Sequence, residues 1–316
     1  MPKVTDDQKA DGAPVGRQAP DGPAHLAPEV RGVLGWSRDD RIAYAKAEQW
    51  INHTRAVEAL RALSDLMAAP RTAPAPGLLL CGQSGNGKST LLDRFRSAHP
   101  PTSLADGRTS CPVLAVEVPH DPTETRFWTA LLTAAGVAHR DTDPVLRKMQ
   151  QALSVLAYMQ VRLLIVDEFH NVLLGQPRHQ RQLLALIRSL SNPPLRIPMV
   201  LAGTEAAVRA IQTDDQLERR FDDFVLPRWT EGDGYRRLLR GFERLLPLAE
   251  PSGLDGDDMA RALHAKSGPT IGGLARVLKR LAVLAIGDGR ERIDLARVRA
   301  FEGFGKEERG MRARRL

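Results

Sequence analysis

The sequence predicts an α/β protein in which a parallel five-stranded sheet is followed by a small domain of helices. Short apolar runs alternate with helical patterns from residue 77 onwards, an order typical of a parallel sheet that is covered on both faces. A glycine-rich octet separates the first apolar run from the helix that follows it. After Trp229 only helical patterns remain, which indicates a second, all-helical unit.

The composition is typical of a soluble globular protein with an excess of basic residues. Of the 316 residues, 42% are apolar and 26% are charged, and the formal net charge is +7. This balance favours a polyanionic partner, although a merely soluble arginine-rich protein would show the same charge. Cys81 and Cys111 lie in or beside apolar runs without metal-ligand spacing, so we expect small core residues.

No segment has the pattern of a targeting or membrane-spanning sequence. The first residues lack the apolar stretch of a signal peptide. No apolar run approaches the length that a transmembrane helix needs. We therefore expect a cytoplasmic protein in a reducing compartment.

The chain before the sheet divides into two parts. Residues 1–30 are rich in Pro, Gly, Ala and Asp and show no apolar period, so we expect a disordered extension. Apolar residues then recur at three- and four-residue steps over residues 39–69, which predicts an N-terminal helical segment within residues 31–76. Pro70, Pro74 and Pro76 end this pattern.

The core is expected over residues 77–230 as an alternation of strands and helices. The predicted strands are the apolar runs at residues 77–81, 112–118, 162–167, 197–202 and 224–226. The predicted helices lie at residues 88–98, 125–135, 144–159, 178–190, 205–211 and 216–220. Their amphipathic spacing suits helices that pack on a sheet.

The remaining chain is expected to form a helical lid domain and a basic tail. The lid covers residues 231–302, and its helices are predicted at 235–245, 257–265, 274–286 and 295–301. The tail, residues 303–316, contains Arg309, Arg312, Arg314 and Arg315.

The octet after the first strand matches the phosphate-binding pattern G-x-x-x-x-G-K-[ST] without a gap. Its glycines allow a tight loop whose backbone N–H groups point at phosphate oxygens, beside the positive end of a helix dipole. Lys88 is expected to reach the β- and γ-phosphates of ATP, and Ser89 to place its hydroxyl on Mg²⁺. The predicted nucleotide-binding residues are Gly82, Gln83, Ser84, Gly85, Asn86, Gly87, Lys88, Ser89 and Thr90.

Two carboxylates, Asp167 and Glu168, end the third predicted strand. With the octet upstream, we expect Asp167 to hold Mg²⁺ and Glu168 to polarise the attacking water as a general base. The alternative is an ordinary strand end with solvated acids. His170 completes a D-E-x-H pattern found in some helicases, but a two-lobed helicase needs a second strand series, which is missing after Trp229. His170 and Asn171 are expected instead to couple the nucleotide state to the next segment.

Three further residues are candidates for the hydrolysis step. Thr204 follows the fourth predicted strand, where a hydroxyl can sense the γ-phosphate or the attacking water; it can equally serve as a helix N-cap. Arg219 and Arg220 end a short helix before the last strand. One of them is expected to reach the nucleotide of a neighbouring subunit, and Arg220 is the first choice.

These residues and several other runs resemble the TniB/TnsC group of AAA+ ATPases, which regulate transposition in bacterial mobile elements. The resemblance covers about residues 35–295, and its most specific parts are the Asp-Glu-Phe-His-Asn run at 167–171 and the Asp-Gln-Leu-x-x-Arg-Phe run at 215–221. The other runs are the octet at 82–89, Trp50-Ile51-Asn52-His53, Val118-Pro119 with Phe127-Trp128, Ser191-Asn192, Ile197-Pro198-Met199-Val200, Gly203-Thr204-Glu205-Ala206, Leu226-Pro227-Arg228-Trp229, Leu245-Leu246-Pro247-Leu248 and the helix from Gly268 to Ile286.

The resemblance implies an AAA+ P-loop core and an ATP-dependent regulator of transposition. Such proteins bind ATP with Mg²⁺ between subunits, assemble as rings or helical filaments on double-stranded DNA, and are dismantled by hydrolysis, which is expected here to be slow and regulatory. The partners implied are a TniA-like transposase and a TniQ-like targeting protein. The chain departs from many AAA+ proteins at residues 268–273, where no lid arginine is present and Arg276 lies a turn further on.

The sequence contains no helix-turn-helix or zinc-finger pattern. We therefore expect contact with the DNA backbone that does not depend on base sequence. In this fold the loops after the second and third strands face a central channel. Thr123, Thr125 and Arg126 lie in the first of these loops, and Arg178 and Arg181 flank the second. A solvated surface is the alternative for each. The basic tail could add affinity or contact a partner.

Two other functions fit the same residues. A different AAA+ switch, such as a helicase loader, would share the core but needs a motif that docks a helicase. A nucleotide-dependent DNA scaffold would bind ATP with negligible turnover, which the presence of Glu168 argues against only in part.

Overall fold

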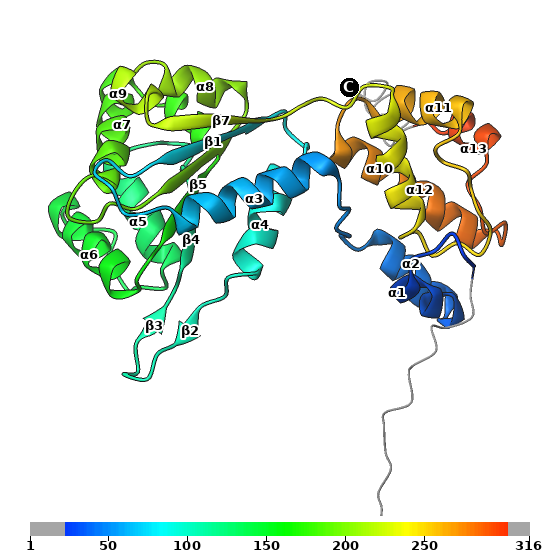
Figure 1. Cartoon of the computed structure of the whole chain (residues 1–316), viewed down its shortest axis with the longest axis horizontal. Coiled ribbons are helices and arrows are strands. Elements are labelled where there is room, and N and C mark those ends of the chain that lie inside the picture. Colours follow the sequence, from blue (N-terminus) through cyan, green and yellow to red (C-terminus); the bar gives the residue numbers. More distant parts are fainter. Residues whose placement is uncertain (1–22, 303–316) are drawn as a thin grey trace, which may run out of the picture.

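The computed structural model describes residues 23–302 of the chain, arranged as an α/β lobe and a helical lobe (Figure 1). A linker after the sheet and a second connection before α3 join the two lobes. The residues outside this range are 1–22, most of the expected disordered extension, and 303–316, the expected basic tail.

The main sheet has five parallel strands in the order β4-β5-β6-β1-β7. The strands are β1 (Gly77–Gly82), β4 (Val113–Glu117), β5 (Leu163–Asp167), β6 (Met199–Gly203) and β7 (Phe221–Leu226). All five positions follow the predicted apolar runs, and the predicted parallel sheet is confirmed. In this order β6 lies between β1 and β5, so the carboxyl ends of these three strands are neighbours.

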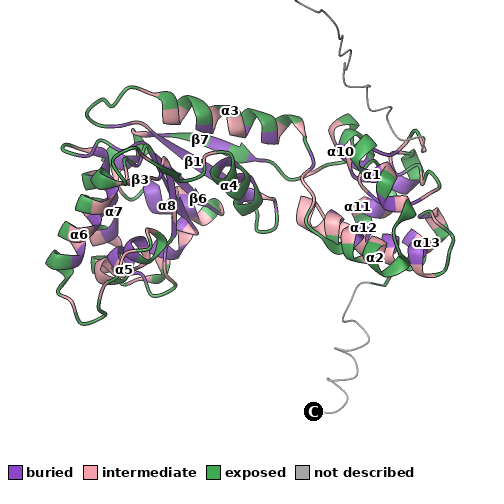
Figure 2. Cartoon of the chain, turned by 90° about the horizontal axis from the view of Figure 1, so that it is seen from below, coloured by how far each residue is buried: buried purple, intermediate pink, exposed green. Residues whose placement is uncertain are grey.

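Alternate side chains of the strands pack into two separate hydrophobic layers, as the two-residue period of a strand requires. One layer lies under α3 (Thr54–Ala68) and α4 (Lys88–Ser97). The other lies under α5 (Glu124–Ala134), α6 (Val145–Tyr158), α7 (Pro177–Ser191), α8 (Glu205–Ile211) and α9 (Asp215–Glu218). Figure 2 shows the strands buried between exposed helix faces. Cys81 and Cys111 are free and buried, as small core residues.

A short hairpin between α4 and β4 did not follow from the periodicity. β2 (Thr102–Ser103) and β3 (Thr109–Ser110) pair antiparallel and project from the α/β lobe (Figure 1). Gly107 in its turn has φ 81°, which a residue without a Cβ adopts readily. The Asp-Gly pair at residues 106–107 was the available hairpin signal.

The helical lobe is built from both ends of the described chain. Its C-terminal helices are α10 (Asp233–Glu243), α11 (Asp257–Ser267), α12 (Ile271–Gly287) and α13 (Leu295–Ala300). The N-terminal helices α1 (Pro28–Arg31) and α2 (Arg38–Lys46), with the 3₁₀ turn η1 (Gly32–Gly35) between them, lie in the same lobe (Figure 1). The hydrophobic core of this lobe includes Ala45 from α2.

Basic side chains fasten α2 to the C-terminal helices. Arg38 donates to the carbonyl of Gly287 over 2.6 Å. Arg41 forms an ion pair with Glu291 and donates to the carbonyl of Pro247 over 2.7 Å. Hydrogen bonds from a charged guanidinium are stronger than neutral ones, so this part of the expected segment 31–76 packs with the lid and not with the core.

Residues 23–30 differ from the expected disorder. Leu26, Ala27 and Val30 are buried and pack near Tyr44 and Leu245. The few apolar residues at the end of the extension therefore find a partner surface on the helical lobe, which composition alone did not reveal.

The helical pattern expected over residues 39–69 is broken by an extended stretch, residues 47–53, here called the strap. Ile51 in the strap is buried against α10, where a Cβ on Gly241 would lie 2.7 Å from its Cγ2. The strap's apolar side chains thus satisfy a helical spacing while they pack between the two lobes.

Among the described residues, no helix is both long and apolar enough to cross a membrane.

Candidate nucleotide-binding site

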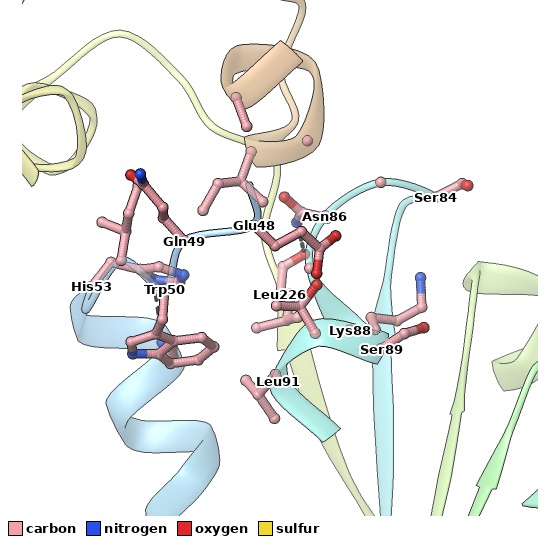
Figure 3. A pocket seen from close by; sticks show the side chains of 18 of the residues that line it. Glu48, Gln49, Trp50, His53, Ser84, Asn86, Lys88, Ser89, Leu91 and Leu226 are labelled. Atoms are coloured by element: carbon pink, nitrogen blue, oxygen red, sulfur yellow. Dashed lines mark hydrogen bonds between the residues drawn. The ribbon is translucent and has the colours of Figure 1, made fainter. Parts of the chain in front are cut away.

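A cavity of about 440 Å³ lies where the carboxyl ends of the strands meet the helical lobe. Ligands of open α/β sheets bind at this edge, outside the carboxyl ends of the strands. The walls include the strap, the loop after β1 with the start of α4, the ends of β5, β6 and β7, and α12, and Ala56, Phe242 and Leu246 also line the cavity. Figure 3 shows strap residues Glu48, Gln49 and Trp50 on one side and Ser84, Lys88 and Ser89 on the other.

The backbone conformation of the phosphate loop depends on its glycines. Gly85 and Gly87 have φ values of 74° and 83°, in the left-handed region that other residues adopt at a cost. The carboxamide of Asn86 donates to the carbonyls of Leu226 and Pro227 over 3.0 and 2.9 Å. Asn86 therefore fastens the phosphate loop to the linker that leaves the sheet. The octet predicted from the sequence forms one loop between β1 and α4.

Lys88 is buried at the start of α4. Its Nζ donates to the carbonyls of Gly82 and Gln83 over 2.8 and 3.2 Å. Burial lowers the pKa of Lys88, and the charges of Glu168 and Asp167 oppose this shift. A buried cation with only two carbonyl partners and acids nearby is well suited to receive phosphate oxygens.

Ser89 and Asp167 face each other at the site. The Ser89 Oγ donates to Asp167 Oδ2 over 2.9 Å, and the other carboxylate oxygen accepts from the Glu168 backbone over 2.7 Å. A hydroxyl and a carboxylate are oxygen ligands of the kind that Mg²⁺ prefers, usually completed by phosphates and water. The described residues hold no cluster of three or more His, Cys, Asp or Glu suited to a metal. The hydroxyl of Ser89 and the carboxylate of Asp167 are oxygen ligands that fit a Mg²⁺ ion shared with a nucleotide.

Glu168 stands at a sharp turn of the backbone. It has φ 52° and precedes the 3₁₀ helix η2 (Phe169–Leu174). Its side chain is 39% exposed and lines the cavity together with Lys88 and Ser89. Left-handed backbone at a non-glycine residue is often found at functional sites. The turn places a carboxylate at the end of β5 without burying it.

Thr204 lines the same cavity at the end of β6. It occupies the N-cap position of α8, but its side chain accepts no capping hydrogen bond there. The hydroxyl thus remains available to the cavity. Of the two roles considered for Thr204, this geometry favours the one at the site.

The two arginines before β7 lie in different surroundings. Arg220 is half-buried, and its Nη1 donates to Ser191 Oγ and Asn192 Oδ1 of the same chain over 3.0 and 3.3 Å. Arg219 is exposed, and its side chain has no hydrogen-bond or ion-pair partner among residues 23–302. Neither arginine lines the cavity. Arg220 was the first choice from the sequence, which could not show its hydrogen bonds to Ser191 and Asn192.

The DNA candidates lie on the α/β lobe away from the cavity lining. Thr125 and Arg126 are in the first turn of α5, and Arg126 pairs with Asp121 over 3.2 Å. Arg178 and Arg181 are exposed in the first two turns of α7. A Cβ on Gly175 would lie 3.0 Å from Pro122, so the two loops that precede α5 and α7 touch. Thr123 caps α5, its Oγ1 accepting from the Arg126 backbone over 3.3 Å.

Several residues of the cavity were not singled out from the sequence. Glu48 and Gln49 of the strap and Lys279 of α12 line it, and Lys279 donates to the carbonyl of Lys46 over 3.2 Å. On α12 the lining residues Ile271, Ala275 and Lys279 share one face at four-residue spacing, whereas Arg276 is exposed and does not line the cavity. The four-residue spacing was the only signal in the sequence for Lys279.

Comparison with known proteins gives one family and a set of similar folds. The model of a family described as bacterial TniB protein matches residues 41–231. No match was found among curated protein sequences. The ORC2 protein of Aeropyrum pernix, in ADPNP-ADP complexes, has a TM-score of 0.59 at 18% identity and covers 84% of this chain and 73% of that chain.

Two further solved structures are similar. The Aeropyrum pernix ORC1 protein in complex with DNA has a TM-score of 0.57 at 20% identity, covering 81% of this chain and 67% of that chain. CDC6P from Pyrobaculum aerophilum has a TM-score of 0.56 at 17% identity, covering 81% and 68%. At these identities the likeness concerns the fold alone, and it agrees with the predicted P-loop core and helical lid.

Proposed function

The chain belongs to the family of bacterial TniB proteins and has an AAA+ P-loop fold, and we propose that it is an ATP-dependent regulator of DNA transposition. In this proposal it binds ATP with Mg²⁺, assembles as rings or filaments on double-stranded DNA, recruits a TniA-like transposase, and is released by hydrolysis. A TniQ-like targeting protein is the third partner.

The observation that carries the proposal is the convergence of four predicted groups on one cavity. Lys88, Ser89, Glu168 and Thr204 come from three neighbouring strand ends and all line it. The sequence separates the first and last of these by more than a hundred residues, so their meeting follows from the strand order. A chance P-loop pattern would not gather an acid and a hydroxyl at the same edge.

The residues divide the work of phosphoryl transfer. Lys88 and the backbone N–H groups of the phosphate loop bind the phosphates. Ser89 and Asp167 would hold Mg²⁺, which neutralises charge on the β- and γ-phosphates when bound. Glu168 orients and deprotonates the attacking water. Thr204, with its hydroxyl free of the α8 cap, positions that water or the γ-phosphate.

An arginine from a neighbouring copy completes the site in this proposal. Arg219 supports this role best because it is exposed, whereas Arg220 is held by Ser191 and Asn192 of its own chain. A cation supplied across an interface stabilises the charge of the transition state and makes hydrolysis depend on assembly. ATP therefore links adjacent subunits, and loss of its γ-phosphate weakens the link.

Duplex DNA is proposed to lie against the adjoining N-terminal ends of α5 and α7, which carry Arg126 and Arg178. Their contact through Pro122 and Gly175 supports one continuous surface. Thr125 and Arg181 extend this surface along α5 and α7. The ion pair of Arg126 with Asp121 is exposed on both sides, at 60% and 64%, and exposed pairs of this kind are weak. Arg126 can therefore exchange its carboxylate for a DNA phosphate.

Substitution of Glu168 by Gln tests whether hydrolysis releases the assembly. The lifetime of the full chain on a labelled duplex is measured in ATP and Mg²⁺, after dilution into unlabelled DNA. We expect E168Q to stay bound at least ~10-fold longer than the wild type, because a general base contributes about 10²–10⁴-fold to hydrolysis. Equal lifetimes would contradict the proposal and favour a scaffold with negligible turnover.

Electron microscopy should show rings or helices on the duplex, and discrete monomers would contradict assembly.

A further inference from the structure

His170 is in direct contact with the proposed general base. Its Nε2 lies 3.3 Å from Glu168 Oε2, and the two side chains are 26% and 39% exposed. Both side chains line the nucleotide cavity, together with Thr204. Glu168 has a left-handed backbone conformation and stands two residues before His170 in the chain.

The other side of the imidazole rests on the end of β6. A Cβ placed on Gly203 would lie 3.4 Å from His170 Nδ1 and 3.3 Å from the His170 backbone nitrogen. The same Cβ would lie 2.8 Å from Ala207 Cβ, so the glycine is required by α8, and the ring lies within van der Waals distance of this strand end. Because Thr204 is the next residue, the ring of His170 lies between the general base and the strand that carries the hydroxyl.

The hydrogen-bonding pattern fixes how the ring acts. His170 Nδ1 is buried and has no hydrogen-bond partner among the described residues. A carboxylate accepts hydrogen bonds and cannot donate them, so the proton of the neutral ring belongs on Nε2, facing Glu168. We therefore assign the ring N–H to Nε2, the ring nitrogen that lies 3.3 Å from Glu168 Oε2.

The backbone around His170 is held on both sides. Phe169 is fully buried. Asn171 is buried as well, and its Nδ2 donates to the carbonyl of Val118 over 2.9 Å, while its backbone nitrogen donates to the carbonyl of Glu168 over 2.9 Å. The ring is thus carried by a fixed segment, and the exposed carboxylate is the freer partner of the two.

We propose that His170 is a positioning residue for ATP hydrolysis: its Nε2–H holds the carboxylate of Glu168, and its ring ties that carboxylate to the strand end at Gly203 and Thr204. The general base and the hydroxyl at the γ-phosphate then keep a fixed relation to each other. This inference rests on the proposed ATPase function and assigns a role within it. His170 would therefore affect the rate of hydrolysis. The affinity for ATP would still be set by the phosphate loop.

Two substitutions separate this role from simple packing. Gln places its amide donor near the position of Nε2, whereas Asn places it near Nδ1 and cannot reach Glu168. Steady-state hydrolysis by the full chain is measured with duplex DNA, for wild type, His170→Gln and His170→Asn. We expect His170→Asn to lower kcat by ~10-fold, part of the 10²–10⁴-fold that a general base supplies, with KM for ATP within about twofold. His170→Gln should keep most of the wild-type kcat.

A double substitution gives the decisive comparison. In the Glu168→Gln background, His170→Asn should cause no further loss of kcat, because the two residues act through one contact. Equal kcat values for wild type and His170→Asn, or an undiminished loss in the Glu168→Gln background, would overturn the role of His170. If Glu168→Gln itself leaves hydrolysis intact, the proposed ATPase site fails instead, so the two failures are distinguishable. Thermal melting of each variant identifies a folding defect, and in that case the His170→Gln kinetics decide.

Discussion

The backbone N–H of Gly272, in the first turn of α12, donates a hydrogen bond to the carbonyl of Gly85 over 2.9 Å. The helical lobe is thereby joined to the phosphate loop by main-chain atoms. A Cβ on Gly272 would lie 2.7 Å from the Gly85 carbonyl oxygen, so the close approach requires glycine. Through this hydrogen bond the lid contacts the phosphate loop within residues 268–273, where the sequence has no arginine. Arg276, a turn further on, is exposed.

Substitution of Gly272 by Ala tests this joint. The added methyl group must push the lid away from the phosphate loop, at a cost of about 1–3 kcal/mol. We expect the Kd for ATP to rise by ~10-fold or more, since 1.4 kcal/mol corresponds to about a factor of ten. Gly287→Ala in the same helix is the control, because a Cβ there meets only the end of Arg38 at 3.4 Å. Equal ATP affinity for both variants would show that the joint does not matter for binding.

Arg219 and Arg220 are distinguished by subunit mixing. Arg219→Ala should lower hydrolysis by ~10³-fold or more, the usual contribution of an arginine supplied across an interface. Mixing Arg219→Ala with Lys88→Ala should restore part of the rate, because one variant keeps the site and the other keeps the arginine. Arg220→Ala should instead lower the melting temperature, since it removes the bonds to Ser191 and Asn192. Restoration by mixing with Arg220→Ala and not with Arg219→Ala would reverse the assignment.

The DNA surface can be measured through its salt dependence. Each phosphate contact contributes about 0.9 to the slope of log affinity against log salt concentration. Arg178→Ala and Arg126→Ala should each weaken duplex binding at all sequences and reduce the slope by ~1. Arg61→Ala is a matched control, because Arg61 is 84% exposed on α3 and away from these loops. A slope that changes as much for Arg61→Ala as for Arg178→Ala would refute this surface.

His53 gives a prediction for the effect of pH on stability. Its Nδ1 accepts a hydrogen bond from the Ala56 backbone over 3.2 Å and so caps α3. Burial lowers the pKa of His53 from its ordinary value of 6.5. The unfolded chain then binds the proton first, so the free energy of unfolding falls as the pH drops through 6.5 toward the folded pKa.

The check is a melting series between neutral and mildly acidic pH for wild type and His53→Asn. Asn caps a helix without titrating, so the variant should lose less of its melting temperature over this range. Parallel curves for the two proteins would mean that the protonation of His53 is not linked to folding.

The strands and the phosphate loop could be predicted because their signals are local. The octet ending in Lys88 and Ser89 specifies its loop through its own glycines, and β5 is a continuous apolar run ending on Asp167. The helices after residue 77 could be placed within a few residues because their buried faces repeat at helical spacing. The meeting of these parts followed from the predicted sheet.

The strap and the lid wall depend on contacts between distant segments, and the sequence carried little trace of them. Trp50 and Ile51 fit a helical spacing, yet Ile51 is buried by Gly241 of α10. Lys279 lines the cavity only because α12 packs over the phosphate loop. The choice between Arg219 and Arg220 required knowing that Ser191 and Asn192 lie beside one of them. Such facts belong to tertiary packing and not to local pattern.

Binding of a triphosphate at Lys88 is expected to control the binding of duplex DNA. Fluorescence anisotropy of a labelled duplex is titrated with wild type and Lys88→Ala, each with and without a slowly hydrolysed ATP analogue and Mg²⁺. The wild type should bind tightly only with the analogue, and Lys88→Ala should bind equally weakly in both conditions. An analogue-dependent gain in Lys88→Ala as large as that of the wild type would contradict the account.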